Sequence, residues 1–319
     1  MLFDKTIKRI FKSTLLKRHD PDGSVFYFDP EDFGLEYDRL DFKGDKRQIL
    51  RGRFYKKDVT HLDTLVVFEH GMGNGHKAYM REIATVCEAG YEVFAYDHTG
   101  TLESEGEHIG GFSQSLADLD HAITAVKQSG RVGGRKLAVI GHSWGGFSTM
   151  NIPALHKDID AVVALSGYVS PIEMIRSALG GLKGYADLLF EEVEAPFGHY
   201  AYADARYSLA LSATRALIIH SEDDSTCPVS HFDKLKAALS GNYNVTFMLI
   251  DGKRHNPTFT ADAVVYKDAF FRAQMKLKKK KKLATPEQKA AFVGSYDWNR
   301  MTEQDGEIWA RILGFIKNK

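Results

Sequence analysis

One serine stands where its hydroxyl could act as a nucleophile. Ser143 is the centre of the segment Gly141-His142-Ser143-Trp144-Gly145, which follows the apolar run 137–140. A G-x-S-x-G segment between a buried strand and a helix forms a sharp turn that presents the serine hydroxyl at the end of the strand. The two glycines keep Cβ atoms out of the crowded turn. This short pattern also occurs by chance, and the strand before it favours the catalytic interpretation.

A serine nucleophile needs a base, and chain order reduces the thirteen histidines to two. When the serine lies on a strand-to-helix turn, the acid follows it in the chain and the histidine comes last. Only His231 and His255 come after a plausible acid. His231 lies close to the acidic loop and is predicted to open a helix over 232–239. His255 follows a predicted strand, in the turn 251–257, so we expect His255 to be the base.

The acid is expected directly after the predicted strand 215–220. That strand leads into the loop 221–225, which contains the three carboxylates Glu222, Asp223 and Asp224. A carboxylate at this place would orient the imidazole and stabilise its cation. Position along the chain does not choose among the three.

Acyl transfer through a serine also needs two backbone N–H groups that bind the developing oxyanion. Trp144, directly after the nucleophile, is expected to supply one of them. The Gly-rich turn 71–75, which follows the apolar strand 64–69, is expected to supply the other. Three alternating glycines could instead cradle a phosphate, but they lack the final spacing of a dinucleotide-binding G-x-G-x-x-G motif. We therefore expect no cofactor, and no residue cluster has the spacing of a metal site.

The candidate residues follow predicted strands of one large fold. A chain of 319 residues that is 44% hydrophobic can bury a single sizeable core. Helical patterns separate the later strands, which predicts a mostly parallel sheet with helices on both faces. The first two strands are joined by a few residues, so they are expected to form an antiparallel hairpin. The eight strands are predicted at about 35–42, 48–56, 64–69, 91–96, 136–141, 160–166, 215–220 and 244–250.

Four motifs make the chain resemble the α/β-hydrolase superfamily. The likeness is strongest to the branch that includes monoacylglycerol lipases, cinnamoyl esterases and serine-aminopeptidase-like hydrolases. It extends over about residues 48–275 and the last helix. The resemblance implies an α/β-hydrolase fold with an eight-stranded sheet and a short helical cap. The motifs are 70–73, 97–104, 141–146 and 252–257.

The resemblance also assigns roles that spacing leaves open. It implies that Met72 supplies the second oxyanion N–H and that Asp224 is the acid. Two positions depart from the pattern of the relatives: Ser221 replaces a usual glycine, and Arg254 stands where small residues often precede the histidine. Asp223 therefore remains the alternative acid.

The same likeness predicts the domain organisation. Residues 34–166 and 206–319 are expected to form the hydrolase core, with an extra helix at about 285–300. Residues 1–33 are expected to form a basic amphipathic helix and a lead-in, and residues 167–205 the cap. An apolar stripe in the cap either packs it onto the core or lines an acyl or aryl pocket above Ser143. The candidate pocket residues are Ile172, Ile175, Leu179 and Tyr200.

Charge and composition limit the partners that can be expected. The formal net charge is zero, which argues against nucleic acid. Basic residues at both ends of the chain are usually solvated surface, and adsorption to anionic lipid is the alternative. Residues 1–20 lack the apolar core of a signal peptide, and no run of eighteen apolar residues is present. With Cys87 and Cys227 expected to be reduced thiols, the default is a cytoplasmic protein with possible peripheral membrane contact. The oligomeric state stays open.

The sequence therefore predicts a serine hydrolase that cleaves a small or medium carboxylic ester through an acyl-enzyme on Ser143. Two alternatives share this chemistry: a monoacylglycerol or lysophospholipid hydrolase at a membrane surface, and a peptide or amide hydrolase. A non-catalytic binding protein on the same fold is least favoured, because the chain keeps both Ser143 and His255.

Overall fold

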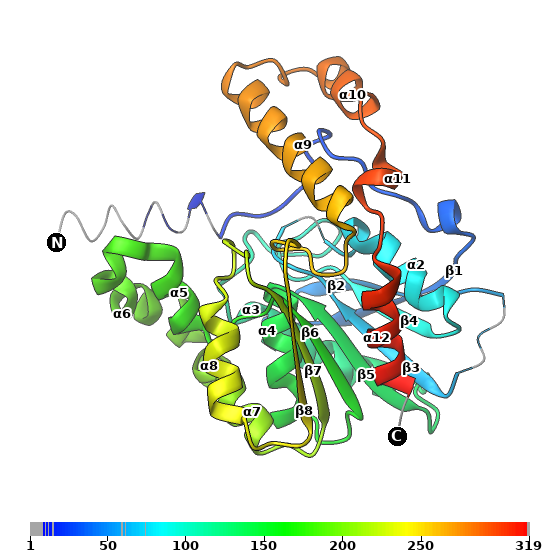
Figure 1. Cartoon of the computed structure of the whole chain (residues 1–319), viewed down its shortest axis with the longest axis vertical. Helices are drawn as coiled ribbons and strands as arrows, with labels where there is room; N and C mark the ends of the chain where they lie inside the picture. The colour runs from blue at the N-terminus through cyan, green and yellow to red at the C-terminus, as the bar shows by residue number, and fades with distance from the viewer. Residues whose placement is uncertain are drawn as a thin grey trace.

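A single eight-stranded sheet runs through the molecule. The structure is a computed structural model that describes residues 9, 11, 13, 14, 16–58, 60, 62–73 and 75–317. The strands are arranged in the order β1-β2-β4-β3-β5-β6-β7-β8 (Figure 1). They are β1 (Glu36–Lys43), β2 (Ile49–Lys56), β3 (Thr64–Glu69), β4 (Glu92–Tyr96), β5 (Lys136–His142), β6 (Ala161–Leu165), β7 (Arg215–Ser221) and β8 (Val245–Ile250).

The strand directions agree with the sequence prediction. β1 and β2 form an antiparallel hairpin, and β2 also pairs antiparallel with β4. From β4 through β3 to β8, every neighbouring pair is parallel. The prediction of an eight-stranded, mostly parallel sheet is confirmed, and each strand boundary lies within two residues of its expected position. The carboxyl ends of six parallel strands therefore meet at one edge, where loops can bring distant residues together.

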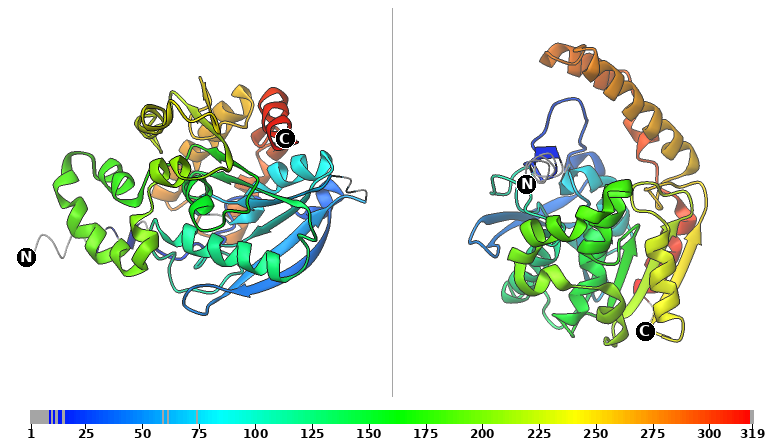
Figure 2. Two further views of the ribbon diagram at one scale, coloured as in Figure 1. Left: turned by 90° about the horizontal axis from the view of Figure 1, so that it is seen from below. Right: turned by 90° about the vertical axis from the view of Figure 1, so that its left-hand side faces the viewer.

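Helices cover both faces of this sheet, because the central strands are apolar on both sides. β3, β4 and β6 are buried along their whole length. One face packs against α3 (Gln114–Gln128), α4 (Trp144–Asn151), α7 (Ala205–Ala210) and α8 (Ser230–Leu239). The other face packs against α2 (Met80–Glu88) and α12 (Gly306–Lys317). Figure 2 shows these two helical layers on either side of the sheet.

The segment predicted as a cap is a series of short helices beside the α3 and α4 layer. It contains α5 (Pro171–Leu179), α6 (Ala186–Leu189) and the irregular helical stretch 190–202. Figure 1 places α5 and α6 at one side of the molecule. The domain boundaries given above remain predictions.

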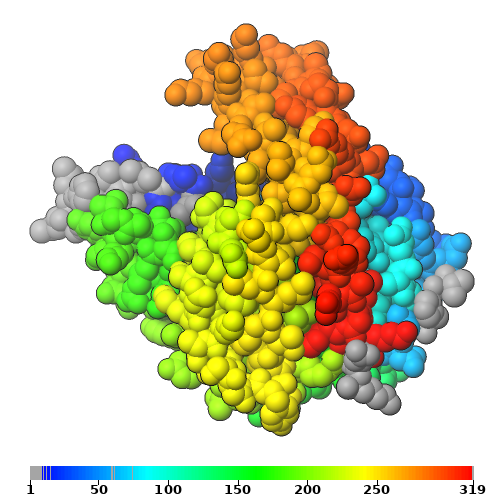
Figure 3. Space-filling model, viewed as in Figure 1, coloured from blue at the N-terminus to red at the C-terminus, as the bar shows by residue number. Residues whose placement is uncertain are grey.

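A second helical projection was only partly expected from the sequence. α9 (Ala261–Lys279), α10 (Pro286–Gly294) and α11 (Trp298–Met301) form what we call the arm, residues 261–301. It rises above the carboxyl edge of the sheet, drawn in orange in Figures 1 and 3. The predicted extra helix at about 285–300 corresponds to α10 and α11.

An aromatic cluster holds the arm together, and an early part of the chain holds the arm in place. The Phe270 ring lies 5.1 Å from Phe292 and 5.1 Å from Trp298, measured between ring centroids. Gln274 donates hydrogen bonds to the backbone oxygen and the hydroxyl of Ser24, at 2.9 and 3.0 Å. The segment 22–28 therefore acts as a strap along the arm.

Most of the predicted N-terminal amphipathic helix lies outside the described residues. Phe11 and Leu16 are described, and both are buried in the core cluster next to α3. Arg18 donates to the backbone oxygens of Leu102, Ser104 and Gly106. In the described part of the chain, no helix combines the length and apolar character that crossing a membrane requires.

Candidate active site

The turn after β5 holds Ser143 in a strained conformation. Ser143 has φ 58° and ψ −111°, a region that residues with a Cβ atom rarely occupy, and it lies directly before α4. Neighbouring atoms lie too close to the two flanking glycines to leave room for a side chain at either position. A Cβ atom on Gly141 would lie 2.2 Å from Thr149 Oγ1, and one on Gly145 would lie 2.4 Å from the backbone oxygen of Glu69. The turn thus presents the Ser143 hydroxyl at the carboxyl edge of the sheet.

Three side chains from three different loops form a hydrogen-bonded chain. His255 Nε2 lies 2.8 Å from Ser143 Oγ, and His255 Nδ1 lies 2.8 Å from Asp224 Oδ2. The other oxygen of Asp224 accepts the backbone N–H groups of Thr226 and Cys227, both at 2.9 Å. Burial alone would raise the pKa of Asp224, but the hydrogen bond and charge of His255 hold it below its usual value. The arrangement has the geometry of a nucleophile, a base and an orienting acid.

The two neighbouring carboxylates are placed elsewhere. Asp223 Oδ1 accepts the hydroxyl of Ser221 at 2.6 Å and the backbone N–H of Arg254 at 2.8 Å. Glu222 is exposed to solvent. Of the three candidates, Asp224 is therefore the one that meets His255, and Asp223 ties the acidic loop to the histidine loop.

The expected oxyanion donors are the backbone N–H groups of Trp144 and Met72. Trp144 is the first residue of α4, and the first N–H groups of a helix have no acceptor within it. Met72 lies in the turn after β3 and lines the same open cleft as Ser143 and His255, with a volume of about 550 Å³. Met72 thus shares the cleft with Ser143, and Trp144 directly follows Ser143 in the chain.

Comparisons with known proteins agree with this architecture. A model of the family described as serine aminopeptidase, S33, matches residues 60–196. An esterase of Pyrococcus furiosus superposes with a TM-score of 0.60 at 21% identity, covering 82% of this chain and 98% of the esterase. This chain has the α/β-hydrolase fold.

The names of other similar proteins indicate different activities. Epoxide hydrolase A of Mycobacterium tuberculosis is 32% identical over 129 residues, and the match covers 36% of this chain. The chain thus spans 37% of the length of that curated relative. An acylaminoacyl peptidase of Pyrococcus horikoshii superposes with a TM-score of 0.53 at 17% identity, over 70% of this chain and 38% of the peptidase. At such identities the structural likeness concerns the α/β-hydrolase fold.

A hydrogen-bonded relay that the sequence did not indicate joins the loops around Ser143. Tyr79 Oη accepts the backbone N–H of Gly71 at 3.1 Å and donates to His142 Nδ1 at 2.8 Å. His142 Nε2 in turn donates to the backbone oxygen of His255 at 2.6 Å. Burial, with the nearby charge of His255, lowers the pKa of His142 to about 3, so the ring stays neutral and can both accept and donate. The relay fixes the turn 71–73 relative to the loop that contains His255.

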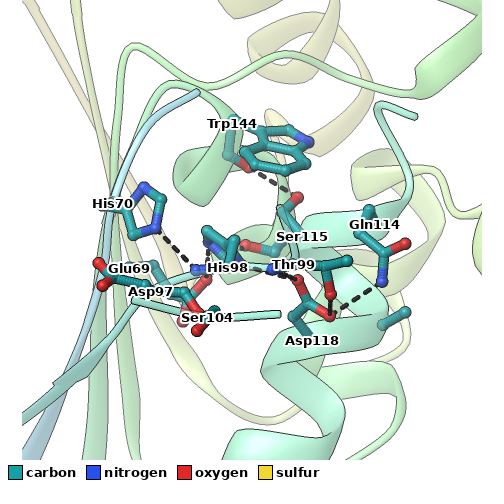
Figure 4. A network of polar contacts seen from close by, with 12 residues as sticks. Glu69, His70, Asp97, His98, Thr99, Ser104, Gln114, Ser115, Asp118 and Trp144 are labelled. Atoms are coloured by element: carbon teal, nitrogen blue, oxygen red, sulfur yellow. Dashed lines mark hydrogen bonds and ion pairs between the residues drawn. The ribbon is translucent and has the colours of Figure 1, made fainter. Parts of the chain in front are cut away.

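A buried polar network lies next to Trp144, at the start of α4 (Figure 4). His98 Nε2 lies 3.1 Å from Glu69 Oε2, and His98 Nδ1 lies 3.3 Å from Asp118 Oδ2, with all three side chains fully buried. Burial would lower the pKa of His98, but the charge of Glu69 and the hydrogen bond of Asp118 raise it to about 9. The charged ring packs against the indole of Trp144, with ring centroids 4.8 Å apart. The network thereby supports the start of α4.

The four cap residues predicted to line the substrate pocket do not lie in the cleft around Ser143. Ile175 is fully buried in the core, and Ile172, Leu179 and Tyr200 pack against the same core cluster. The Tyr200 hydroxyl donates to Asp120 Oδ2 at 2.6 Å. In this structure the apolar stripe therefore attaches the cap segment to the body. Across the described residues, no group of three or more His, Cys, Asp or Glu side chains could hold a metal ion.

Proposed function

We propose that this α/β-hydrolase is a serine hydrolase of carboxylic esters that works through an acyl-enzyme on Ser143. The observation that carries the proposal is the hydrogen-bonded chain from Ser143 through His255 to Asp224, at 2.8 Å for each step. His255 accepts the hydroxyl proton as Ser143 Oγ attacks the acyl carbon, and the N–H groups of Met72 and Trp144 bind the oxyanion. His255 then donates the proton to the departing alcohol, and water releases the acid by the reverse sequence.

The first test is covalent labelling of the nucleophile. A fluorophosphonate probe is expected to label Ser143, identified by peptide mass spectrometry. Ser143→Ala is expected to abolish labelling and to lower hydrolysis of p-nitrophenyl acetate by about four orders of magnitude or more. Ser225→Ala, on an exposed serine of the same open cleft, is the matched control and should keep labelling. Unchanged turnover by Ser143→Ala would contradict the proposal.

Amide hydrolysis is the second candidate function. Proteins with peptidase names are among the structural matches, including a puromycin-hydrolysing peptidase of Mycobacterium tuberculosis with a TM-score of 0.52. Paired p-nitrophenyl esters and p-nitroanilides with the same acyl group distinguish the two candidates. We expect kcat/KM to be higher for the ester by more than the intrinsic difference in reactivity.

A further inference from the structure

A small, partly open cavity lies between the arm and the body of the molecule. Its volume is about 130 Å³, and its walls come from the strap 22–28, from residues 68–82 and from the arm. Most of the lining is apolar and aromatic, with Phe28, Phe259, Phe270 and Trp298 among the wall residues. We call it the arm cavity. The residues of the cap segment do not contribute to its walls.

The arm cavity lies next to the cleft that contains Ser143. Seven residues line both the cavity and the cleft: Gly71, Met72, Tyr79, His142, Asn256, Lys267 and Phe271. Met72, whose N–H is proposed to bind the oxyanion, is one of these shared residues, so the carbonyl group of a bound ester would lie next to the wall that the cleft shares with the arm cavity.

The volume of the cavity limits the size of the group that it accepts. An engineered protein cavity of about 150 Å³ is known to hold one benzene molecule, which has six non-hydrogen atoms. The arm cavity, at about 130 Å³, is therefore suited to a group of about six non-hydrogen atoms. A long fatty acyl chain would not fit.

One buried group in the wall lacks a partner. Glu82 on α2 is 4% exposed, and its Oε2 atom has no hydrogen-bond partner among the residues that the structure describes. A buried acceptor left unpaired costs about 1–3 kcal/mol. Lys267 on α9 also lines the cavity, where its ammonium group donates to Asn256 Oδ1 at 2.9 Å and keeps further N–H groups.

The two groups together favour a neutral polar ligand. The cavity presents a carboxyl group and an ammonium group, so a charged ligand would meet one group of like charge. A hydroxyl can donate to Glu82 and accept from Lys267. The other cations in the wall are engaged elsewhere: Lys77 lies 3.6 Å from Glu103, and Arg81 donates to Asn299.

We propose that the arm cavity binds the acyl group of the substrate, that this group has about six non-hydrogen atoms beyond its carbonyl carbon, and that it carries a hydroxyl bound by Glu82. The proposal rests on the serine hydrolase function proposed above. It makes the arm, and not the cap segment, the element that selects the substrate.

The first experiment compares acyl chains in solution. Hydrolysis of ethyl acetate, butyrate, hexanoate and octanoate is followed by titration of the released acid, next to ethyl 6-hydroxyhexanoate. We expect kcat/KM to rise about fourfold for each added methylene up to hexanoate, because burying a methylene contributes about 0.8 kcal/mol. For octanoate we expect kcat/KM to fall, because its chain is longer than the cavity accepts. The 6-hydroxyhexanoate, which has five methylenes and one hydroxyl beyond the carbonyl carbon, is expected to be the best substrate.

Substitutions in the wall then locate the effect. Glu82→Met keeps the volume and removes the carboxyl group, so it should reverse the preference and make hexanoate better than 6-hydroxyhexanoate. Ala78→Leu narrows the cavity and should lower kcat/KM for hexanoate at least tenfold while leaving acetate within twofold. Phe271→Ala removes a partly exposed wall and should extend the accepted chain to octanoate. Ala203→Leu in the cap segment is the matched control and should leave the chain-length profile unchanged.

The outcomes separate the two proposals. If Ser143 is labelled and ethyl acetate is hydrolysed but Ala78→Leu and Glu82→Met do not change the profile, the assignment of the arm cavity is wrong and the serine hydrolase proposal stands. If Ala203→Leu instead changes the dependence of kcat/KM on acyl chain length, the acyl pocket lies at the cap segment. Acetate esters of alcohols from ethanol to octanol vary the length of the leaving alcohol instead of the acyl chain. If kcat/KM depends on the length of the alcohol and not on the length of the acyl chain, the assignment of the cavity to the acyl group is wrong. If the wild-type protein is not labelled at Ser143 and hydrolyses none of the esters, both proposals are wrong.

Discussion

His255 is held by contacts on several sides, and each contact has a different physical role. Asp224 fixes the ring from one side, through a carboxylate whose second oxygen is occupied by two backbone N–H groups. His142 fixes the backbone of the same residue. Asp223 holds the backbone of the preceding Arg254, which has a positive φ of 48°. The position of the imidazole is therefore set by both its side chain and its main chain.

This arrangement predicts unequal effects for the neighbouring carboxylates. Asp224→Asn is expected to lower kcat by about 10⁴-fold, because an amide in this position favours the wrong tautomer of His255. Asp223→Asn should cost less than tenfold, since it weakens a loop contact, and Glu222→Gln on the exposed side chain is the control. Steady-state kinetics with p-nitrophenyl acetate gives the comparison. A greater loss for Asp223→Asn would place the acid one residue earlier.

Removal of one hydroxyl is predicted to loosen two loops at once. Tyr79→Phe leaves the N–H of Gly71 and His142 Nδ1 without their shared partner. Displacements of about 1 Å at a reacting group can cost about 100-fold, so we expect kcat to fall between 10- and 100-fold. The ring remains in the wall of the arm cavity, so the chain-length profile should be retained. Tyr202→Phe, on an exposed side chain, serves as the comparison, and a changed profile with an unchanged kcat would contradict a positioning role.

The start of α4 depends on the network between β3, β4 and α3. Glu69 ends β3, His98 follows β4 and Asp118 belongs to α3, so their contacts connect three elements beneath Trp144. Ser115 on α3 also donates to the backbone oxygen of Trp144 at 3.1 Å. The N–H that is expected to bind the oxyanion thus has a rigid support from several elements.

The charge of His98 predicts a pH dependence of stability. Its pKa in the folded protein, about 9, lies above its ordinary value of 6.5, so its contribution is fully present below pH 6.5 and is lost as the pH rises through 9. We expect the difference in unfolding free energy between the wild type and His98→Gln to shrink by roughly 2–4 kcal/mol from pH 6 to pH 10. The groups that face this ring are Glu69, Asp118, His70, Tyr96 and Trp144.

Urea unfolding at several pH values gives this difference directly. His199→Gln, on an exposed histidine, is the control and should show a constant difference. A constant difference for His98→Gln as well would mean that His98 is neutral in the folded protein.

The sequence predicted the strands, Ser143 and His255 because those signals are local, whereas the choice of Asp224 came from the resemblance to a known family. A buried parallel strand is a short apolar run, and each candidate residue directly follows one, as Ser143 follows 137–140. Tyr79 gave no such signal, because its partner His142 lies 63 residues away and nothing in its neighbourhood distinguishes it from a packing residue. For the same reason, apolar periodicity in the cap segment did not distinguish residues that line a pocket from residues that pack on the core.

The described N-terminal residues pack against the body of the protein. Phe11 is 6% exposed and packs edge-on against Phe112, with ring centroids 6.3 Å apart. The body of the protein covers Phe11 and Leu16, which are apolar residues of the segment predicted as an amphipathic helix. A contact of the remaining N-terminal residues with a lipid surface stays a proposal.

Truncation of the Phe11 side chain is therefore predicted to destabilise the fold. Phe11→Ala should lower the free energy of unfolding by about 3 kcal/mol, as for other large-to-small changes in a core. Arg9→Ala, on an exposed side chain two residues earlier, should change it by less than about 0.5 kcal/mol. Thermal and urea denaturation measure both effects. An equal small effect of the two substitutions would indicate that the N-terminal segment is detached in solution.

The contact between the strap and the arm joins residues 250 positions apart, from Ser24 to Gln274. Such a non-local contact closes a very long loop, so it forms late, after the sheet has brought the two segments close. During synthesis, the strap therefore has no partner until the arm has left the ribosome. In the native protein, the strap and the arm then form one cooperative unit, whose amides are expected to exchange with solvent together and before those of β3 and β5.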